Sequence, residues 1–324
     1  MANLLRPKYF KQAYNEFKGD YGYHHQKVVL ENKPNIHCIE LTNACNLRCT
    51  MCFMDIMKRK KNFMKFSVFK KIIDENHKNM NLVYLQAFGE STLHKELPEF
   101  IRYAKSKNVR TGLHTNGTLL TKELSNAMMD SGLYSIRFSI DGITEEKYNK
   151  IRIGGDFERL QQNIKDFVEI KNAHHYTTRI AVQIIHMNET KDDIAAFKKE
   201  WDREGIDEVI VRKHINWRRQ WDYQRTVPCL YVWKSVVILW NGDVALCCND
   251  WDGDLILGNM EHQTLEEVWN GPRYQMVREK MIKGQIDFKP CKGCNVLDHV
   301  RQYKTYPFSS AIFEQSKKVL NSLA

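Results

Sequence analysis

The chain has 324 residues, of which 43% are hydrophobic and 27% charged, and its formal net charge is +10 at pH 7. This length can bury a core for one large α/β domain plus a smaller one, and the composition excludes a disordered or fibrous chain. No apolar run approaches the roughly 20 residues that cross a bilayer, and the N-terminal segment lacks the apolar stretch of a secretion signal. We therefore expect a cytoplasmic protein without a membrane partner. The positive charge suits an acidic partner or an anionic substrate, but charge alone predicts no nucleic-acid partner.

From residue 35 onward, short β-rich runs alternate with amphipathic helical patterns. The predicted strands are Asn35–Leu41, Leu82–Phe88, Val109–His114, Tyr134–Ile140, Thr178–His186 and Asp207–Arg212. The predicted helices are Ser67–Lys78, Leu97–Lys107, Lys122–Ser131, Phe157–Ala173 and Asp192–Glu204. Repeated β-then-α units predict a parallel sheet, because parallel strands need crossover connections. Six units are too few for a closed eight-stranded barrel, so we predict a partial (β/α)6 TIM-like barrel with its chemistry at the carboxyl ends of the strands.

After about residue 215 the pattern changes. Tyr231–Trp240 and Val244–Cys248 predict a β-hairpin around an Asn-Gly turn, and a helical stretch near Leu265–Lys283 follows. We therefore expect a helical extension at 1–34, the partial barrel at 35–215, a small β-hairpin and helix domain at 216–300, and a helical tail at 301–324.

Nine cysteines fall into an N-terminal and a C-terminal group, with none in the intervening 176 residues. Reducing conditions oppose disulfides, so the two groups predict two metal sites. Cys45, Cys49 and Cys52 form C-x3-C-x2-C after the first predicted strand. Three thiolates can bind three irons of a [4Fe–4S] cluster and leave the fourth iron open, whereas zinc would want a fourth local ligand. Zinc or a chance spacing remain alternatives, and Cys38 is expected to be a buried hydrophobic residue.

The C-terminal group supplies four potential ligands, gathered by the hairpin and a C-x2-C turn. They are Cys229, Cys247, Cys291 and Cys294. Four thiolates can fully coordinate either zinc or a cubane cluster, and the residues alone leave both open. Cys248 is adjacent to Cys247, so both cannot easily bind one cluster.

C-x3-C-x2-C just after a first strand resembles the signature of the radical S-adenosylmethionine (SAM) superfamily. The resemblance covers about residues 35–215. It implies that SAM chelates the open iron through its amino and carboxylate groups and is cleaved to a 5′-deoxyadenosyl radical. The cofactor carries the difficult chemistry, while the protein positions it and excludes solvent.

Later motifs in this sequence also resemble that family. Phe88-Gly89-Glu90-Ser91 is similar to its Gly-Gly-Glu-Pro motif, which implies that Gly89 and Glu90 hold the methionyl amino group; Phe88 and Ser91 depart from the pattern. The alternative is a β–α turn with a solvated glutamate.

Three further positions follow from the same resemblance. Asn116 belongs to a Thr-Asn-Gly sequence, whose alternative is a plain turn. Ser139 begins Ser-Ile-Asp-Gly, which implies a place near the methionyl carboxylate or ribose. Arg152 has the chemistry to pair with that carboxylate, although an arginine placed there could equally lie on the surface.

The C-terminal segment around Gly242 and Cys247 is similar to the Gly-x4-Cys hairpin of SPASM and Twitch domains. Four ligands indicate the shorter Twitch type, so the resemblance implies two [4Fe–4S] clusters, one that binds SAM and one auxiliary. The chain also resembles the Twitch-type aminocyclitol dehydrogenase, which implies that Arg212 contacts the reacting hydroxyl group. A plain salt bridge is the alternative for Arg212, and Lys213 and His214 are neighbouring candidates.

These resemblances imply an oxidoreductase that takes hydrogen from a small-molecule substrate: a sugar, a cyclitol or a nucleotide-linked sugar. One alternative is a maturase of ribosomally made peptides, although residues 1–34 are too short for the added peptide-binding domain that such enzymes often carry. Another is a non-enzymatic iron–sulfur or zinc protein. An electron donor such as flavodoxin or ferredoxin is also implied. Lys58–Lys61 either docks that donor or is a solvated loop, and Trp217–Trp221 forms either a lid or a packing surface between the modules.

Overall fold

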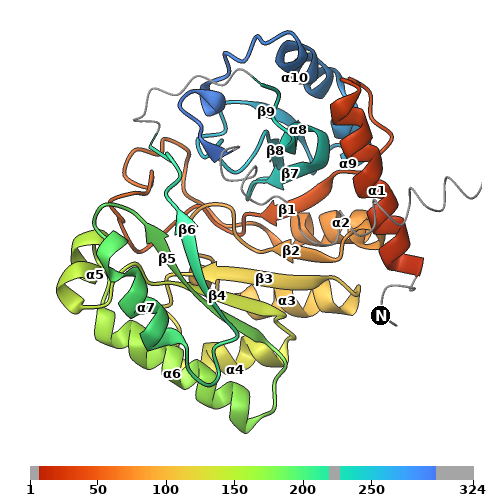
Figure 1. Cartoon of the computed structure of the whole chain (residues 1–324). Helices are drawn as coiled ribbons and strands as arrows, with labels where there is room; N and C mark the ends of the chain where they lie inside the picture. The colour runs from red at the N-terminus through yellow and green to blue at the C-terminus, as the bar shows by residue number, and fades with distance from the viewer. Residues whose placement is uncertain (1–6, 219–226, 297–324) are drawn as a thin grey trace, which may run out of the picture.

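The computed structural model describes residues 7–218 and 227–296, with side chains from residue 11 onward. A single nine-stranded sheet runs through it in the order β6-β5-β4-β3-β2-β1-β7-β8-β9 (Figure 1). Helices α3, α4, α6 and α7 lie on the outer side of the curved half of this sheet (Figure 1). The predicted tail at 301–324 lies outside the described residues.

The six predicted β–α units are confirmed. The strands are β1 (Asn35–Ile39), β2 (Leu82–Tyr84), β3 (Arg110–Thr115), β4 (Ser135–Ser139), β5 (Arg179–His186) and β6 (Glu208–Lys213). The main helices are α2 (Phe66–Asn76), α3 (Leu97–Ser106), α4 (Lys122–Asp130), α6 (Phe157–Ala173) and α7 (Ile194–Trp201), and α5 (Glu145–Ile151) is an additional helix. Neighbouring strands from β1 to β6 all pair in parallel, as a partial TIM-like barrel requires.

Helix α6 illustrates how the sequence determines the layer of helices outside the sheet. Asp156 precedes it, and its carboxylate accepts a hydrogen bond from the backbone N–H of Arg159, which caps the first turn. Leu160, Ile164 and Phe167 recur at helical spacing and are all fully buried. The apolar stripe of α6 therefore packs against the outer face of the sheet.

The C-terminal hairpin extends the barrel sheet. The strands β7 (Ser235–Ile238), β8 (Asp243–Ala245) and β9 (Ile256–Asn259) follow one another, and β7 pairs in parallel with β1. This pairing occupies the backbone hydrogen-bonding groups that β1 would otherwise expose at a sheet edge. The two modules are thus joined through a continuous sheet, while the domain boundaries given above remain predictions.

Two predicted elements differ from the structure. The first predicted strand of the hairpin begins four residues later, because Tyr231–Lys234 forms the short helix α8. The single predicted helix near Leu265–Lys283 is two helices, α9 (Leu265–Trp269) and α10 (Pro272–Ile282). Pro272 has no N–H to donate to the preceding turn, so a continuous helix cannot pass through it.

The N-terminal helix α1 (Pro7–His24) packs against α8. Asn32 and Tyr23 donate side-chain hydrogen bonds to the backbone carbonyls of Trp233 and Pro228, at 2.9 and 3.2 Å. None of the helices in the described residues has the length and apolar character needed to cross a membrane.

Candidate active site

The first cysteine group lies in the loop after β1. Cys45, Cys49 and Cys52 are all half-buried, and the Cys52 N–H donates to the Cys49 carbonyl at 2.9 Å, which winds the loop into a turn. Burial raises the pKa of Cys45 to about 12, and Cys49 and Cys52 are among the neighbours that raise it further. The three thiols are therefore gathered in one place.

Gly89 allows the connection between β2 and α3 to pack closely against this loop. Its φ is +76°, and a Cβ at this position would come within 2.6 Å of the backbone oxygens of Thr42 and Ala44. The next residue, Glu90, donates its N–H to the Ala44 carbonyl at 2.8 Å. Only glycine fits this close approach between the two backbones.

The Glu90 carboxylate is 2% exposed and already accepts several hydrogen bonds from this chain. Oε1 accepts a hydrogen bond from Thr115 Oγ1 at 2.9 Å. It also accepts from the hydroxyl group of Thr92 at 2.7 Å and from the Thr92 N–H at 3.1 Å. Oε2 accepts from the Asn116 N–H at 2.8 Å. Each carboxylate oxygen has two lone pairs, and Oε2 accepts only one of these hydrogen bonds, so it retains one lone pair for a further donor. The predicted contact of Glu90 with the methionyl amino group stays a prediction.

Asn116 ties the end of β3 to the cysteine loop. Its Nδ2 donates to Asn46 Oδ1 at 2.9 Å, and Asn46 Nδ2 donates to Thr118 Oγ1 at 2.9 Å. Asn46 lies directly after Cys45. Asn116 therefore positions the loop, and its predicted role in SAM binding is untested.

At the end of β4, Ser139 is half-buried and is followed by a buried ion pair. Arg152 Nη2 bonds Asp141 Oδ2, and Arg152 Nη1 donates to the Cys49 sulfur at 3.5 Å. Burial alone would lower the pKa of Arg152, but the Asp141 carboxylate and the Cys49 thiol outweigh it and raise the value. The predicted surface alternative for Arg152 is therefore wrong, since this side chain is buried next to a cysteine of the first group.

The second cysteine group lies within the C-terminal module, where Cys229 and Cys247 are half-buried and Cys291 and Cys294 are buried. Cys291 and Cys294 are each 7% exposed. Burial raises the pKa of Cys247 well above its ordinary value, and its neighbours Cys248, Cys294, Cys291 and Cys229 raise it further. Asn249 Nδ2 donates to the Pro290 carbonyl at 2.7 Å, which holds the hairpin against the C-x2-C turn. The four predicted ligands are thus brought together.

An aromatic cluster packs against Cys45 and Cys52 of the first group and against Cys248 beside the second. Phe53, next to Cys52, stacks on Trp251 with a centroid distance of 5.0 Å and an interplanar angle of 3°. Phe88 meets the edge of Phe53 at 5.3 Å, and Trp251 Nε1 donates to the Trp217 carbonyl at 2.9 Å. Trp217 thus takes part in packing between the modules, whereas residues 219–221 of the same predicted stretch lie outside the described residues.

Arg59 bonds residues on both sides of the boundary between the barrel and the C-terminal module. Its Nη1 and Nη2 donate to the fully buried Glu40 carboxylate at 2.9 and 2.6 Å, and its Nε donates to the Trp251 carbonyl at 2.7 Å. Asp252 Oδ1 accepts from the N–H groups of Lys58 and Arg59, at 2.7 and 3.1 Å. Within the predicted basic stretch Lys58–Lys61, Arg59 therefore points inward and fastens the first cysteine loop to the auxiliary hairpin.

Arg212 is the penultimate residue of β6 and lies near a group of polar side chains on neighbouring strands. Burial, and then the Arg212 charge, lowers the pKa of His37 on β1. Burial also lowers the pKa of His114 on β3, and the charges of Arg137, Arg212 and His37 lower it further. The sequence analysis singled out Arg212 but missed His37, His114 and Arg137. A polar residue among apolar neighbours in a predicted barrel strand is the signal that would have found them.

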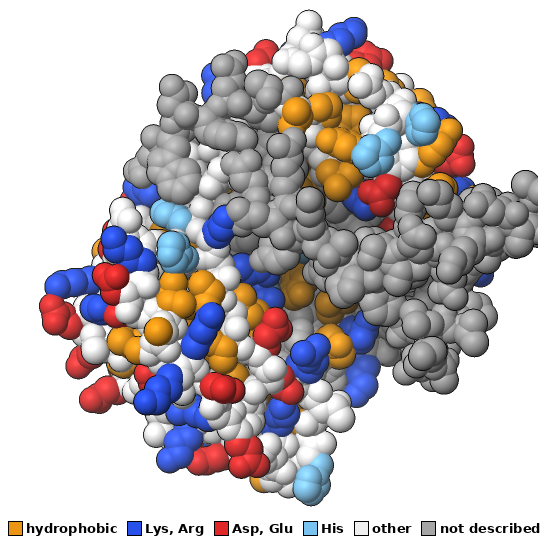
Figure 2. Space-filling view, viewed as in Figure 1, with side chains coloured by type: hydrophobic (Ala, Val, Ile, Leu, Met, Phe, Trp, Pro, Cys, Tyr) orange, Lys and Arg blue, Asp and Glu red, His pale blue; other side chains and the backbone are white. Residues whose placement is uncertain are grey.

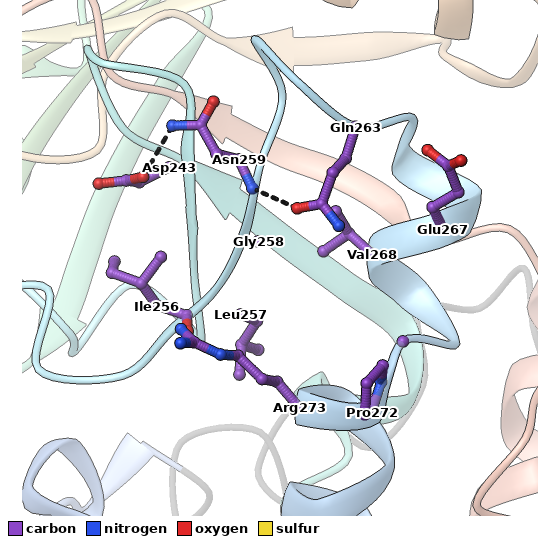
Figure 3. Close-up of a pocket in the computed structure, with 11 residues that line it drawn as sticks. Asp243, Ile256, Leu257, Gly258, Asn259, Gln263, Glu267, Val268, Pro272 and Arg273 are labelled. Atoms are coloured by element: carbon purple, nitrogen blue, oxygen red, sulfur yellow. Dashed lines mark hydrogen bonds between the residues drawn. The ribbon is translucent and has the colours of Figure 1, made fainter.

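A cavity of about 410 Å³ lies elsewhere, between β9 and the helices α9 and α10 (Figure 3). Its polar groups bond to one another: the Asn259 side chain donates through Nδ2 to Asp243 Oδ1 at 2.8 Å, and the Asn259 backbone N–H donates to Gln263 Oε1 at 3.0 Å (Figure 3). None of the cysteines lines it. This cavity therefore does not belong to the candidate active site.

The donor set fits iron–sulfur clusters. The nine cysteines all lie in the described part of the chain and form no disulfide. Within residues 11–218 and 227–296, no three His, Cys, Asp or Glu side chains are placed to hold a single metal ion. A cubane cluster binds each thiolate to a different iron, so its ligands need not meet at one point. Soft thiolates are the ligands that such clusters use.

Comparison with protein families identifies the class to which this site belongs. Residues 39–200 match the radical SAM superfamily, and residues 229–295 match SPASM, an iron–sulfur cluster-binding domain. The chain therefore belongs to the radical SAM superfamily and carries a SPASM domain. Its cofactors are SAM and two [4Fe–4S] clusters, and the enzymatic nature of the superfamily makes this chain an enzyme.

Among curated proteins, the chain is similar to the tungsten-containing aldehyde ferredoxin oxidoreductase cofactor-modifying protein of Pyrococcus furiosus. The two are 26% identical over 321 residues, covering 82% of this chain and 89% of that protein.

Two solved structures share the fold. BtrN in complex with AdoMet and 2-DOIA has a TM-score of 0.56 at 16% identity and covers 81% of this chain and 93% of its own. Streptococcus suis SuiB bound to the precursor peptide SuiA has a TM-score of 0.64 at 14% identity, with 82% and 71% covered. At these identities the likeness concerns the fold alone.

Proposed function

We propose that this enzyme dehydrogenates a small polar substrate bound inside the barrel, a sugar, a cyclitol or a nucleotide-linked sugar. The observation that carries the proposal is the gathering of four thiols in the C-terminal module. Four thiols, those of the half-buried Cys229 and Cys247 and the buried Cys291 and Cys294, would suffice to coordinate every iron of a cubane, so that no iron is left for substrate. A cluster in which a cysteine binds every iron suits electron transfer.

The proposed reaction converts a secondary alcohol into a ketone. When bound, SAM and the first cluster would supply a 5′-deoxyadenosyl radical able to take the hydrogen atom from carbon, and the second cluster would supply an acceptor for the remaining electron. The hydroxyl group loses its proton to solvent, which balances the two-electron oxidation. A flavodoxin or ferredoxin would supply the electron that cleaves SAM.

We assign Arg212 to the reacting hydroxyl group. It stands at the carboxyl end of β6, the edge of the sheet at which barrel enzymes carry their chemistry, and its charge influences both His37 and His114. A guanidinium there would hold the hydroxyl oxygen as charge develops on it. Cys45, Cys49 and Cys52 hold the first cluster in this proposal, and Gly89, Glu90, Asn116, Ser139 and Arg152 surround its SAM.

A second candidate is modification of a ribosomally made peptide. It is favoured by the likeness to SuiB, whose structure contains a precursor peptide. In this alternative the barrel would receive a peptide side chain, and the auxiliary cluster would have the same electron-transfer role.

The test is a substrate screen with the anaerobically reconstituted enzyme, SAM and dithionite. Polar alcohols and short peptides are compared for their ability to increase the release of 5′-deoxyadenosine. The mass of each product is determined by mass spectrometry. The proposal expects an alcohol that loses two hydrogens, with deuterium from the carbinol carbon appearing in 5′-deoxyadenosine. A response to peptides alone would establish the second candidate instead.

A further inference from the structure

Two fully buried side chains of α10, Tyr274 and Arg278, carry polar groups that the proposed chemistry does not use. We propose that the Tyr274 hydroxyl donates a hydrogen bond to the Cys247 sulfur when the auxiliary cluster is bound, and that Arg278 strengthens this bond. The pair thereby raises the reduction potential of the auxiliary cluster. This inference rests on the proposed function, because it assumes that Cys247 binds the cluster that accepts the electron of the substrate.

The Tyr274 hydroxyl lacks the partner that a buried phenol normally has. Its oxygen is buried and makes no hydrogen bond to the residues that the structure describes. A hydroxyl that has left water without gaining a partner is a cost to the folded state, and buried tyrosines usually avoid it. The hydroxyl of Tyr274 is therefore available to a group that binds next to it.

Cys247 is the cysteine that acts on Tyr274. Burial raises the pKa of Tyr274, the Arg278 charge lowers it, and the Cys247 thiol raises it again. Cys247 also packs against the buried core that contains Tyr274 and Cys291. A cysteine that binds iron is deprotonated, and an ionised acceptor makes a stronger hydrogen bond than a neutral one. The cluster-bound Cys247 is thus a suitable acceptor for the Tyr274 hydroxyl.

Arg278 lies one turn further along α10, and its hydrogen-bond acceptors are all uncharged. Nη1 donates to the carbonyls of Val28 and Trp269, both at 2.9 Å, and to Asn270 Oδ1 at 3.4 Å. Nε donates to the Val232 carbonyl at 3.3 Å, and Nη2 is buried without a partner among the described residues. These bonds fasten α10 to its surroundings but leave the positive charge without an acidic partner in the described part of the chain.

The Arg278 guanidinium is stacked on two aromatic rings. Its Cζ lies 4.3 Å from the ring centroid of Trp269 and 4.8 Å from that of Tyr274. The two rings meet edge to face, with centroids 4.8 Å apart. A cation over a phenol draws electron density from it, in agreement with the lowering effect of Arg278 on the pKa of Tyr274. The hydroxyl becomes a better donor as a result.

The auxiliary cluster supplies the negative charge that the surroundings of Arg278 lack. Figure 2 shows Lys and Arg side chains interspersed with Asp and Glu over the outer face of the barrel half, which is ordinary for a protein surface. Arg278 is a buried cation instead. Burial lowers its pKa to about 10, so it stays charged at pH 7, and a buried charge is costly unless something compensates it.

A cubane held by four thiolates has a net negative charge, which increases when the cluster is reduced. A nearby positive charge and hydrogen bonds to the sulfurs therefore favour the reduced form and raise the potential. This is the property that an acceptor of the substrate's electron needs.

The test measures the potential of the auxiliary cluster without any substrate. Every protein is the full chain with Cys45→Ala, which is expected to hold the auxiliary cluster alone after anaerobic reconstitution. Redox titration followed by electron paramagnetic resonance compares this parent with proteins that also carry Tyr274→Phe, Arg278→Gln or Arg278→Lys. Iron content and circular dichroism verify that each protein is loaded and folded.

Tyr148→Phe is the matched control. Tyr148 is also fully buried, and its hydroxyl likewise has no partner among the described residues. Burial raises the pKa of Tyr148 to about 12, and Cys49 of the first group is among the neighbours that add to it. The control therefore removes an equivalent hydroxyl beside the other cysteine group.

We expect Tyr274→Phe to shift the ratio of oxidised to reduced cluster about tenfold toward the oxidised form, because a charge-assisted hydrogen bond is lost. For one electron this is a potential lower by about 59 mV. Arg278→Gln should lower the potential too, and Arg278→Lys should recover part of it. Tyr148→Phe should leave it unchanged.

An unchanged or higher potential in Tyr274→Phe overturns the inference, and so does an equal fall in Tyr148→Phe. An unchanged potential in Arg278→Gln removes Arg278 from it. If the Arg278 variants lose their cluster, Tyr274→Phe still decides, because it deletes a single oxygen atom. The substrate screen is scored separately, so a failure there leaves the measured potentials valid, and unchanged potentials leave the screen valid.

Discussion

Gly89 and Arg152 show how closely individual residues fit around the first cysteine loop. Gly89 lets two backbones meet with a left-handed φ, and Arg152 joins Asp141 to a thiol of the loop. Both residues belong to the structure of the loop as well as to the proposed SAM site. Substitution at either position should therefore affect stability in addition to cofactor binding.

Gly89→Ala should destabilise the fold more than alanine at a second left-handed glycine. Gly284 has a φ of +71°, and a Cβ there would meet nothing within 4 Å, so Gly284→Ala incurs only backbone strain, about 1–2 kcal/mol. Gly89→Ala adds the clash with Thr42 and Ala44, a further cost of about 1–3 kcal/mol. Urea unfolding of both variants measures the difference. Equal losses would show that the close approach is unimportant.

Arg152→Gln should have two effects. The fully buried Asp141 would lose its counter-charge, at a cost of about 3–5 kcal/mol in unfolding free energy. The reduction potential of the first cluster should also fall, because a hydrogen bond and a positive charge next to Cys49 stabilise the reduced cluster. Redox titration followed by electron paramagnetic resonance measures the potential, with Arg152→Lys as the variant that keeps the charge. An unchanged or higher potential in Arg152→Gln would contradict this assignment.

Among the structural elements, the loop after the first cysteine group is joined to the auxiliary hairpin by several side-chain contacts. Arg59 bonds both Glu40 and the Trp251 carbonyl, and Phe53 stacks on Trp251. Burial raises the pKa of Glu40, although Arg59 and the Trp240 N–H lower it. The carboxylate thus depends on these partners for its charge.

Arg59→Ala should destabilise the protein by about 3–5 kcal/mol, because it leaves Glu40 buried without its partner. The matched control is Lys150→Ala, which breaks the Glu146–Lys150 pair on the surface, where the two side chains are 77% and 71% exposed. That control should change stability by about 0.5 kcal/mol or less. Urea unfolding compares the two variants. A loss below about 1 kcal/mol for Arg59→Ala would mean that the network does not hold the modules together.

The elements that local patterns define were predicted well, and those that depend on distant partners were not. Leu160, Ile164 and Phe167 recur at helical spacing, so α6 was predicted with its observed bounds. The pairing of β1 with β7 joins residues about 200 positions apart and leaves no local pattern. Tyr231 and Val232 favour strands by composition, yet Val232 and Trp233 donate their N–H groups to Cys229 and Leu230, which closes a helical turn.

The distinction between local patterns and distant partners also applies to the candidate site. The spacing of Cys45, Cys49 and Cys52 could be read directly, because all three ligands lie in one loop. The partner of Arg152 could not, since it depends on the position of Asp141 across the barrel. The buried position of Arg59 could not be predicted either. A run of basic residues is usually solvated, and the buried acidic partner of Arg59, Glu40, lies 19 positions earlier.

On the scale of the whole molecule, one sheet connects the first cysteine group to part of the second. The first follows β1, and Cys247 and Cys248 follow β8, two strands further along the sheet. Because β1 and β7 are hydrogen-bonded neighbours, the relative position of the two groups is set by the sheet as well as by the Arg59 network. This connection suits a reaction in which an electron must pass from the barrel to the auxiliary site.

The most direct test combines metal content with SAM cleavage in three proteins: wild type, Cys45→Ala and Cys247→Ala. After anaerobic reconstitution, wild type should hold about eight iron and eight sulfide per chain, and each variant about four. With dithionite and SAM, wild type and Cys247→Ala should release 5′-deoxyadenosine, Cys45→Ala should release none, and only wild type should form oxidised product. Four iron in wild type, release by Cys45→Ala, or oxidation by Cys247→Ala would contradict this account.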